Sequence, residues 1–220
     1  MGIISVEQTD RLYWLGRYSE RVYTTIRIFS SHYDTMIDEI EESYGEYCTK
    51  MDIPNIYTSS EDFLKKYCYD EEDPNSLISN LMRAYDNAIV LREEIGSETL
   101  SYIQLAVYAL NRAKVSEAPL IEMQKVLDDI LAFWGIADDS ISDENVRNII
   151  KVGKRIERID LFGRLHIDRE DMLREVHRLV GRVPRTQMKY NKLGLERLNL
   201  LAEAPQLDYY GIVCQVEDII

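Results

Sequence analysis

The stretch from Leu12 to Arg27 reads Leu-Tyr-Trp-Leu-Gly-Arg-Tyr-Ser-Glu-Arg-Val-Tyr-Thr-Thr-Ile-Arg. It belongs to a longer series whose inward positions alternate in steps of three and four, namely Leu12, Leu15, Ser19, Val22, Ile26, Phe29, Tyr33, Met36 and Ile40. That spacing is the period of a helix packed against other helices. Ser5 and Gln8 form a capping-box pattern just before it. The sequence therefore predicts one long helix from Ser5 to about Glu46.

A related stretch occurs in the second half of the chain. Residues 15–22 read Leu-Gly-Arg-Tyr-Ser-Glu-Arg-Val, and residues 152–159 read Val-Gly-Lys-Arg-Ile-Glu-Arg-Ile. The apolar ends, the glycine, the basic residue and the Glu-Arg pair recur at the same spacing. We interpret this agreement as an internal pseudo-repeat of two Gly-x-x-x-Glu-Arg helices.

The helical phase predicts which residues of the repeat meet. Gly16, Glu20 and Arg27 lie on one stripe beside the apolar seam. The second copy has an equivalent stripe, which consists of Gly153, Glu157, Asp160 and Arg164. Glycine at the same place in both copies predicts a close approach of the two helices. Four other basic residues are predicted to point further outward: Arg17, Arg21, Lys154 and Arg158.

A glutamate at the edge of such a contact is partly desolvated and needs a cation, for which arginine is well suited. We therefore expect Glu20 to pair with Arg158 or Arg164. Glu157 is expected to pair with Arg21 or Arg27. Two interpretations remain open: the pairs specify how the helices associate, or they line a polar cleft that binds a ligand.

The rest of the chain predicts further helices and no strand. Asp73-Pro74 begins a long helix to about Ala109 with Gly96 inside it, and Gly135 ends a helix that begins near Leu120. Other helices are predicted at 60–67, from Ser142, from Asp168 to Gly181 and from Pro184 to Ala204. We therefore predict an all-α fold, a bundle of six or seven helices, with residues 1–220 as a single domain.

The charge of the chain is unevenly distributed. The formal net charge is −13, which argues against a general nucleic-acid-binding protein. Residues 147–197, however, contain 14 Lys and Arg against 7 Asp and Glu. This basic segment either packs against the acidic remainder or lines a site for an anionic ligand or an acidic partner.

Several classes of site lack their motifs. None of the three histidines has a glutamate three positions before it, as a di-iron bundle requires, and no nucleotide-binding glycine loop occurs. The three cysteines form no Cys-x-x-Cys pair. Nothing in the local sequence supports a catalytic Cys-His pair such as Cys214 with His177. We expect no metal, no cofactor and no catalytic residue. Reduced cysteines and the lack of a signal peptide or membrane span predict a cytoplasmic protein.

Five parts of the sequence resemble the alpha-E domain family. Trp14 to Arg21 is similar to the Glu-Arg signature of that family, and Gly153 to Arg158 is similar to its second motif. The stretch from Asp73 through Asn87-Ala88 to Arg92 resembles its middle helix. Its remaining two segments are similar to Ile95-Gly96-Ser97-Glu98 and Val183-Pro184-Arg185-Thr186.

The chain departs from the family pattern at Leu100 and Gln104, where Trp and Asn are typical, and it is a compact variant. The resemblance implies a helical protein of undefined biochemical role. It also implies association with ATP-grasp-type ligases or transglutaminase-like proteins in a system that makes or modifies peptide or amide bonds. We therefore expect a non-catalytic accessory or scaffold protein. The alternative is an enzyme, or a substrate-binding subunit, that takes an anionic or peptide ligand in a cleft containing Glu20, Arg27, Glu157 and Arg164.

Overall fold

The computed structural model describes residues 4–38 and 43–220, and the side chains of 4–29 and 44–220. This part of the chain is all-helical, as predicted, and contains no strand. Its helices are α1 (Val6–Asp38), α2 (Ser43–Met51), α3 (Ser60–Tyr69), α4 (Leu77–Val90), α5 (Arg92–Ile95), α6 (Ser97–Ala113), α7 (Pro119–Ser140), α8 (Glu144–Arg164), α9 (Arg169–Val180), the 3-10 turn η1 (Val183–Arg185), α10 (Lys192–Glu203) and α11 (Tyr209–Glu217). Eleven α-helices in the described part replace the predicted six or seven.

The predicted helix from Pro74 to Ala109 is in fact three helices. Gly96 has a φ of 81°, which ends α5 and reverses the chain direction before α6. Since L-residues rarely adopt this backbone conformation, glycine is the natural residue for the break. Helices α4 and α6 then pack against each other. The apolar residues of α4 and α6 follow the same helical period, so the sequence pattern continues across the break.

Two other predicted ends are wrong. Helix α7 continues past Gly135 to Ser140, because Phe133, Trp134 and Ala137 are all buried and their packing outweighs the cost of one glycine. Pro184 lies in η1 and does not begin a helix; α10 begins after Asn191, whose side chain accepts a hydrogen bond from the Gly194 amide.

The first predicted helix is shorter than expected. Ser5 and Gln8 exchange the two hydrogen bonds of a capping box, at 2.9 and 3.1 Å, as predicted. All six predicted inward positions from Leu12 to Phe29 are buried. The side chains of Tyr33 and Met36, and the whole of Ile40, lie outside the described residues. Residues 43–51 form the separate helix α2.

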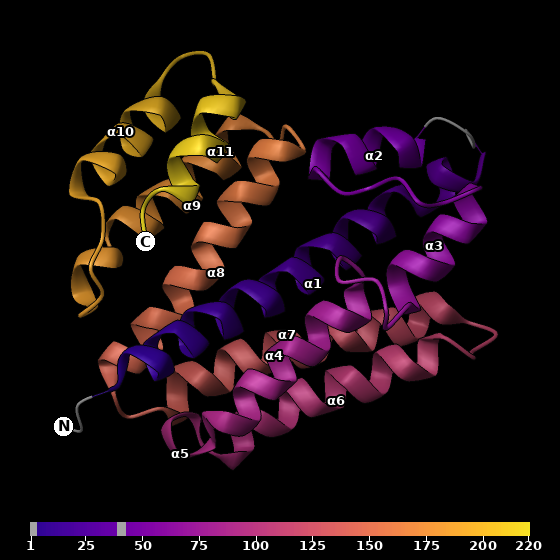
Figure 1. Ribbon diagram of the computed structural model, residues 1–220, viewed down its shortest axis with the longest axis horizontal. Coiled ribbons are helices and arrows are strands. Elements are labelled where there is room, and N and C mark those ends of the chain that lie inside the picture. The colour runs from indigo at the N-terminus through magenta and orange to yellow at the C-terminus, as the bar shows by residue number, and fades with distance from the viewer. Residues whose placement is uncertain (1–3, 39–42) are drawn as a thin grey trace.

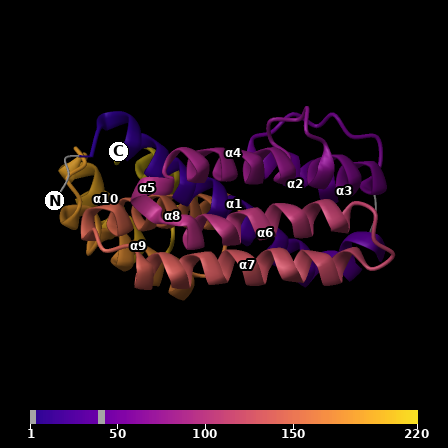
Figure 2. The same cartoon turned by 90° about the horizontal axis from the view of Figure 1, so that it is seen from below.

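Helices α1 and α8 cross in the middle of the molecule (Figure 1). Helices α4 and α7 pack against α1, α6 packs against both α4 and α7, and Figure 2 shows α4, α6 and α7 lying roughly parallel. Helices α9, α10 and α11 form a second group that contacts α8. One continuous hydrophobic cluster includes residues of both groups. The α1–α8 crossing therefore joins the two halves of the fold.

None of the helices at residues 4–38 and 43–220 combines the length and the apolar character that a membrane crossing requires.

Candidate functional site

The crossing of α1 and α8 is centred on two glycines. A Cβ atom added to Gly16 would lie 2.1 Å from the carbonyl oxygen of Ile150. A Cβ atom added to Gly153 would lie 2.1 Å from the carbonyl oxygen of Tyr13. The two contacts are reciprocal, because each carbonyl belongs to the residue three positions before the opposite glycine. The backbones are thus closer than any larger side chain permits, and the motif glutamates are carried into the interface.

Glu157 of α8 is fully buried and is bound by two arginines of α1. The Nε of Arg17 donates to Oε2 of Glu157 at 2.6 Å, and the Nε of Arg21 donates to Oε1. Burial by itself would raise the pKa of Glu157, but the charges of Arg21 and Arg17 outweigh it and hold that pKa below its usual range. Glu157 is therefore an ionised carboxylate closed between two helices.

Glu20 of α1 is also fully buried, but its partners differ. The Nε of Arg158 donates to its Oε1 at 2.5 Å, and the hydroxyl of Thr24 donates to the same oxygen at 2.7 Å. The Oε2 atom has no hydrogen-bond donor among the described residues. Glu20 and Glu157 therefore differ in how their hydrogen bonds are divided between the two carboxylate oxygens.

One partner predicted for each glutamate is present, and the outward orientation predicted for Arg17, Arg21 and Arg158 is wrong. Only 13% of the Arg17 and Arg158 side chains and 28% of the Arg21 side chain are exposed. An arginine stem is long enough to turn back along its helix, so the direction of Cβ does not decide where the guanidinium lies. The favourable pairing with a buried carboxylate decides it instead.

Arg27 and Arg164 do not join these pairs. Arg27 is exposed. Arg164 binds Asp160 within α8 at 3.0 Å and Glu217 of α11 at 2.8 Å. Burial, together with the nearby Glu157 carboxylate, raises the pKa of Asp160 to about 6.

The other residues suggested by the family resemblance lie elsewhere. Arg92 is exposed on α5 and donates to the Ser97 hydroxyl at 2.8 Å. Glu98 is exposed in the first turn of α6. Arg185 is exposed at the end of η1, and burial, together with the nearby charge of Arg185, lowers the pKa of Arg182. The structure therefore brings together the Glu-Arg motifs, and leaves these three residues at the surface.

Glu175 of α9 was missed by the sequence analysis. It is 2% exposed and binds Arg155, Arg158 (3.5 Å) and Arg178 (2.9 Å). Burial would raise its pKa, but the arginine charges outweigh burial and hold the pKa low. Its sequence position did contain a signal, because Glu175 shares the buried helical phase of Met172, Val176 and Leu179.

A basic pocket adjoins this ion-pair network. It has a volume of about 280 Å³ and is lined by Trp134 and Asp138 of α7, Lys151, Lys154 and Arg155 of α8, Arg178 of α9, and Arg182. The ammonium of Lys154 lies 4.0 Å from the centre of the Trp134 ring, a cation–π contact. Burial, only partly offset by Glu20, lowers the pKa of Lys154 to about 7.

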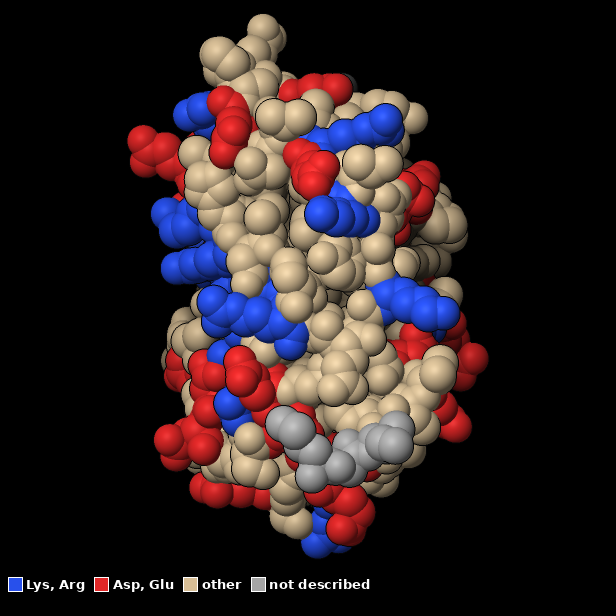
Figure 3. Space-filling view, turned by 90° about the vertical axis from the view of Figure 1, so that its left-hand side faces the viewer, with Lys and Arg blue, Asp and Glu red and all other residues tan. Residues whose placement is uncertain are grey.

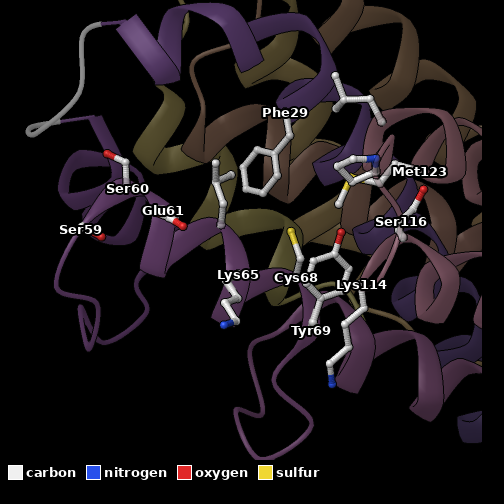
Figure 4. A pocket seen from close by; sticks show the side chains of 14 residues that line it. Phe29, Ser59, Ser60, Glu61, Lys65, Cys68, Tyr69, Lys114, Ser116 and Met123 are labelled. Carbon is white, nitrogen blue, oxygen red and sulfur yellow. The ribbon is translucent and has the colours of Figure 1, made fainter.

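A larger cavity of about 570 Å³ lies between α1, α3, α6 and α7. Its surface is largely apolar, and Figure 4 shows Phe29, Cys68 and Met123 among the side chains that line it. Burial raises the pKa of the Cys68 thiol to about 12, which keeps the thiol protonated and unsuited to nucleophilic catalysis. In the described part of the chain, no group of three or more His, Cys, Asp or Glu is arranged to hold a metal ion.

Residues 8–187 match the model of the Alpha-E family, described as a predicted alpha-helical domain with a conserved ER motif. The chain belongs to the Alpha-E family. Within the matched residues, this Alpha-E chain has two Glu-Arg dipeptides, Glu20-Arg21 and Glu157-Arg158. These are the residues that close the α1–α8 crossing. Neither the curated proteins nor the solved structures contained a match to the chain.

The geometry gives the Glu-Arg dipeptides a definite physical role in this member. Each buried glutamate accepts hydrogen bonds from arginines of the opposite helix, so the charges connect α1 to α8. Removing one partner of such a pair leaves a buried charge uncompensated, which is strongly destabilising. The motif is thus well built to fix the helix crossing.

Proposed function

We propose that this Alpha-E protein is a non-catalytic helical accessory or scaffold protein, the partner of an ATP-grasp-type ligase in a peptide- or amide-bond-forming or modifying system. The observation that carries the proposal is that Glu20 and Glu157 are both fully buried and bound by arginines. Carboxylates held in this way stabilise the fold and do not reach a substrate. The association with a ligase rests on the family resemblance alone.

The repeated motif is part of this proposal. The reciprocal backbone contacts of Gly16 and Gly153 support an internal pseudo-repeat in which the two copies pack against each other. On this interpretation residues 1–220 form one domain built around the pair. Such a rigid crossing would present the outer faces of both helix groups in a constant orientation to a partner.

The charge distribution supports binding to another protein, which we propose takes place in the cytoplasm, and it argues against nucleic acid. Residues 147–197 are net positive, so the negative overall charge of −13 comes from the rest of the chain. Figure 3 shows Lys and Arg side chains gathered along one side of the face that contains α9 and α10, with acidic side chains mostly below them. Separate patches of opposite sign favour oriented docking to a protein partner.

The alternative, an enzyme or substrate-binding subunit with a cleft of Glu20, Arg27, Glu157 and Arg164, has weaker support. Arg27 is exposed, and Arg164 binds Asp160 and Glu217. The four side chains therefore do not converge on one cavity.

The test is to co-express the full chain with an ATP-grasp-type ligase from the same genome and to measure complex formation by analytical ultracentrifugation. We expect a stable complex, and an altered rate of amide formation by the ligase when the chain is added. An isolated chain that forms amide bonds with ATP would contradict the non-catalytic role. A ligase that neither binds the chain nor responds to it would contradict the partnership.

A further inference from the structure

The basic pocket concentrates positive charge that the fold does not neutralise. Five of its seven lining residues are Lys or Arg, and the only lining carboxylate is Asp138, which binds Lys151. Glu175 lies beside the pocket and is already shared by Arg155, Arg158 and Arg178. Grouping cations in a partly buried site is costly unless an anion offsets their charge.

Hydrogen-bond donors at the same place are also unsatisfied. In the described part of the chain, four buried side-chain nitrogens have no acceptor: Trp134 Nε1, Asn148 Nδ2, Arg155 Nε and Arg182 Nε. Three belong to lining residues, and Asn148 accepts a hydrogen bond from Arg182 at 2.8 Å. Trp134 and Asn148 are 8% and 3% exposed. Since buried donors almost always have partners, their gathering at one pocket points to a ligand that accepts several hydrogen bonds.

We propose that the basic pocket is a binding site for a phosphate group, either inorganic phosphate or the phosphate monoester of a small molecule. A phosphate supplies several acceptor oxygens and about two negative charges, which match grouped N–H donors and cations. Arginine is the residue best suited to such oxyanions. The volume of about 280 Å³ lies just below the ~300–1,000 Å³ typical of small-molecule sites, which fits a small ligand.

The carboxylate of Glu175 orients arginines of the pocket and does not itself line the pocket. Glu175 binds Arg155 and Arg178 from α9, so it orients both guanidinium groups while their remaining N–H groups stay available. Burial lowers the pKa of Lys154, Arg155 and Arg182, which is the penalty that a bound anion would reduce. This site is separate from the closed Glu-Arg pairs and does not depend on the ligase partnership.

The first experiment is calorimetric titration of the full chain with sodium phosphate, glycerol phosphate and sodium acetate at constant ionic strength. We expect saturable 1:1 binding of phosphate or glycerol phosphate with a dissociation constant below about 1 mM, and at least tenfold weaker binding of acetate. Tighter binding of glycerol phosphate would assign the site to a monoester, and tighter binding of phosphate to the free ion. Absence of saturable binding, or acetate binding as tightly as phosphate, would overturn the proposal.

Matched variants distinguish phosphate binding in the pocket from general attraction of phosphate to the basic surface. Lys154→Met and Arg182→Gln should each weaken phosphate binding at least tenfold, whereas Lys189→Met should change it less than twofold. Lys189 is an exposed lysine of the same basic segment and does not line the pocket. Equal weakening by Lys154→Met and Lys189→Met would overturn the proposal.

A second readout reports the unsatisfied donor directly. The chain has only two tryptophans, so its amide NMR spectrum contains two indole N–H signals, which Trp134→Phe assigns. Phosphate should shift the Trp134 signal and leave that of Trp14 in place. An unchanged Trp134 signal at saturating phosphate would place the anion elsewhere and contradict the proposed site.

Discussion

Arg17 and Lys154 directly follow the two contact glycines, yet they behave differently. Arg17 binds Glu157 at 2.6 Å and lies 4.9 Å from the ring centre of Trp14. Lys154 binds no carboxylate within the described residues and lies 4.0 Å over the ring of Trp134. One side of the crossing is a closed ion-pair cluster, and the other side opens into the basic pocket.

The difference leaves Glu20 with Arg158 and Thr24 as partners, whereas Glu157 has two arginines. A lysine is a compact charge without the forked geometry that binds a carboxylate twice. The comparison suggests a division of roles: the Arg17 side holds the fold together, and the Lys154 side retains a cation that is available to a ligand.

The largest expected effect comes from adding a methyl group where the backbones of α1 and α8 meet. Gly16→Ala and Gly153→Ala should each lower the free energy of unfolding by about 4 kcal/mol, because the added methyl meets the backbone of the opposite helix. Gly135→Ala is the control, since nothing lies within 4 Å of its added Cβ, and it should stabilise α7 by about 1 kcal/mol. Urea unfolding measures all three; similar values for all three would contradict the close contact.

The two motif glutamates should differ when neutralised. Glu157→Gln leaves Arg17 and Arg21 without a carboxylate and should cost about 3 kcal/mol. Glu20→Gln should cost about 2 kcal/mol, because Arg158 keeps Glu175 as a partner at 3.5 Å. Thermal unfolding measures both. A folded Glu20→Gln protein of unchanged stability that fails to support the partner ligase would instead assign Glu20 to function.

The two basic residues that follow the contact glycines should respond with opposite signs. Arg17→Met should destabilise the fold by about 2 kcal/mol, because Glu157 keeps only Arg21. Lys154→Met should stabilise it by about 1 kcal/mol, or roughly 2–4 °C in the melting temperature, because the cost of burying the ammonium exceeds its contact with Trp134. Destabilisation by both variants would show that the two sides of the crossing are alike.

The gain from Lys154→Met should depend on pH. The pKa of Lys154 is about 7 in the folded chain and about 10.4 in the unfolded chain. Below pH 7 the lysine is charged in both states, so the full penalty applies to the wild type. As the pH rises from 7 to about 10, the folded chain binds fewer protons than the unfolded chain, and the wild-type protein recovers stability. Unfolding at pH 6 and pH 9 should therefore show the larger difference at pH 6.

The smallest effect is expected at Arg27. Arg27→Gln should change the free energy of unfolding by less than about 0.5 kcal/mol, since the residue is exposed and outside the ion-pair cluster. A loss of unfolding free energy as large as that of Arg17→Met in the same assay would show that Arg27 belongs to the ion pairs that stabilise the crossing.

The sequence predicted the parts of this arrangement that depend on local period. Helical spacing predicted the buried seam of α1, and the glycines Gly16 and Gly153 predicted the close approach of α1 and α8. One partner of each glutamate was also predictable, because phase places Glu20 and Glu157 at the edge of that contact. The reversal of the chain at Gly96 was not predictable, because the same apolar period continues through the break.

The directions of the long charged side chains were decided only by the tertiary structure. Arg17 turns inward because a buried carboxylate of another helix attracts it, and Lys154 turns toward Trp134 because α7 places an aromatic ring there. Such side chains have several rotatable bonds, so the position of Cβ does not determine which partner the charged group reaches. The amino-acid sequence alone thus determined the all-helical fold and the contact between α1 and α8, and the tertiary structure decided the break at Gly96 and which charges are paired or remain open to a ligand.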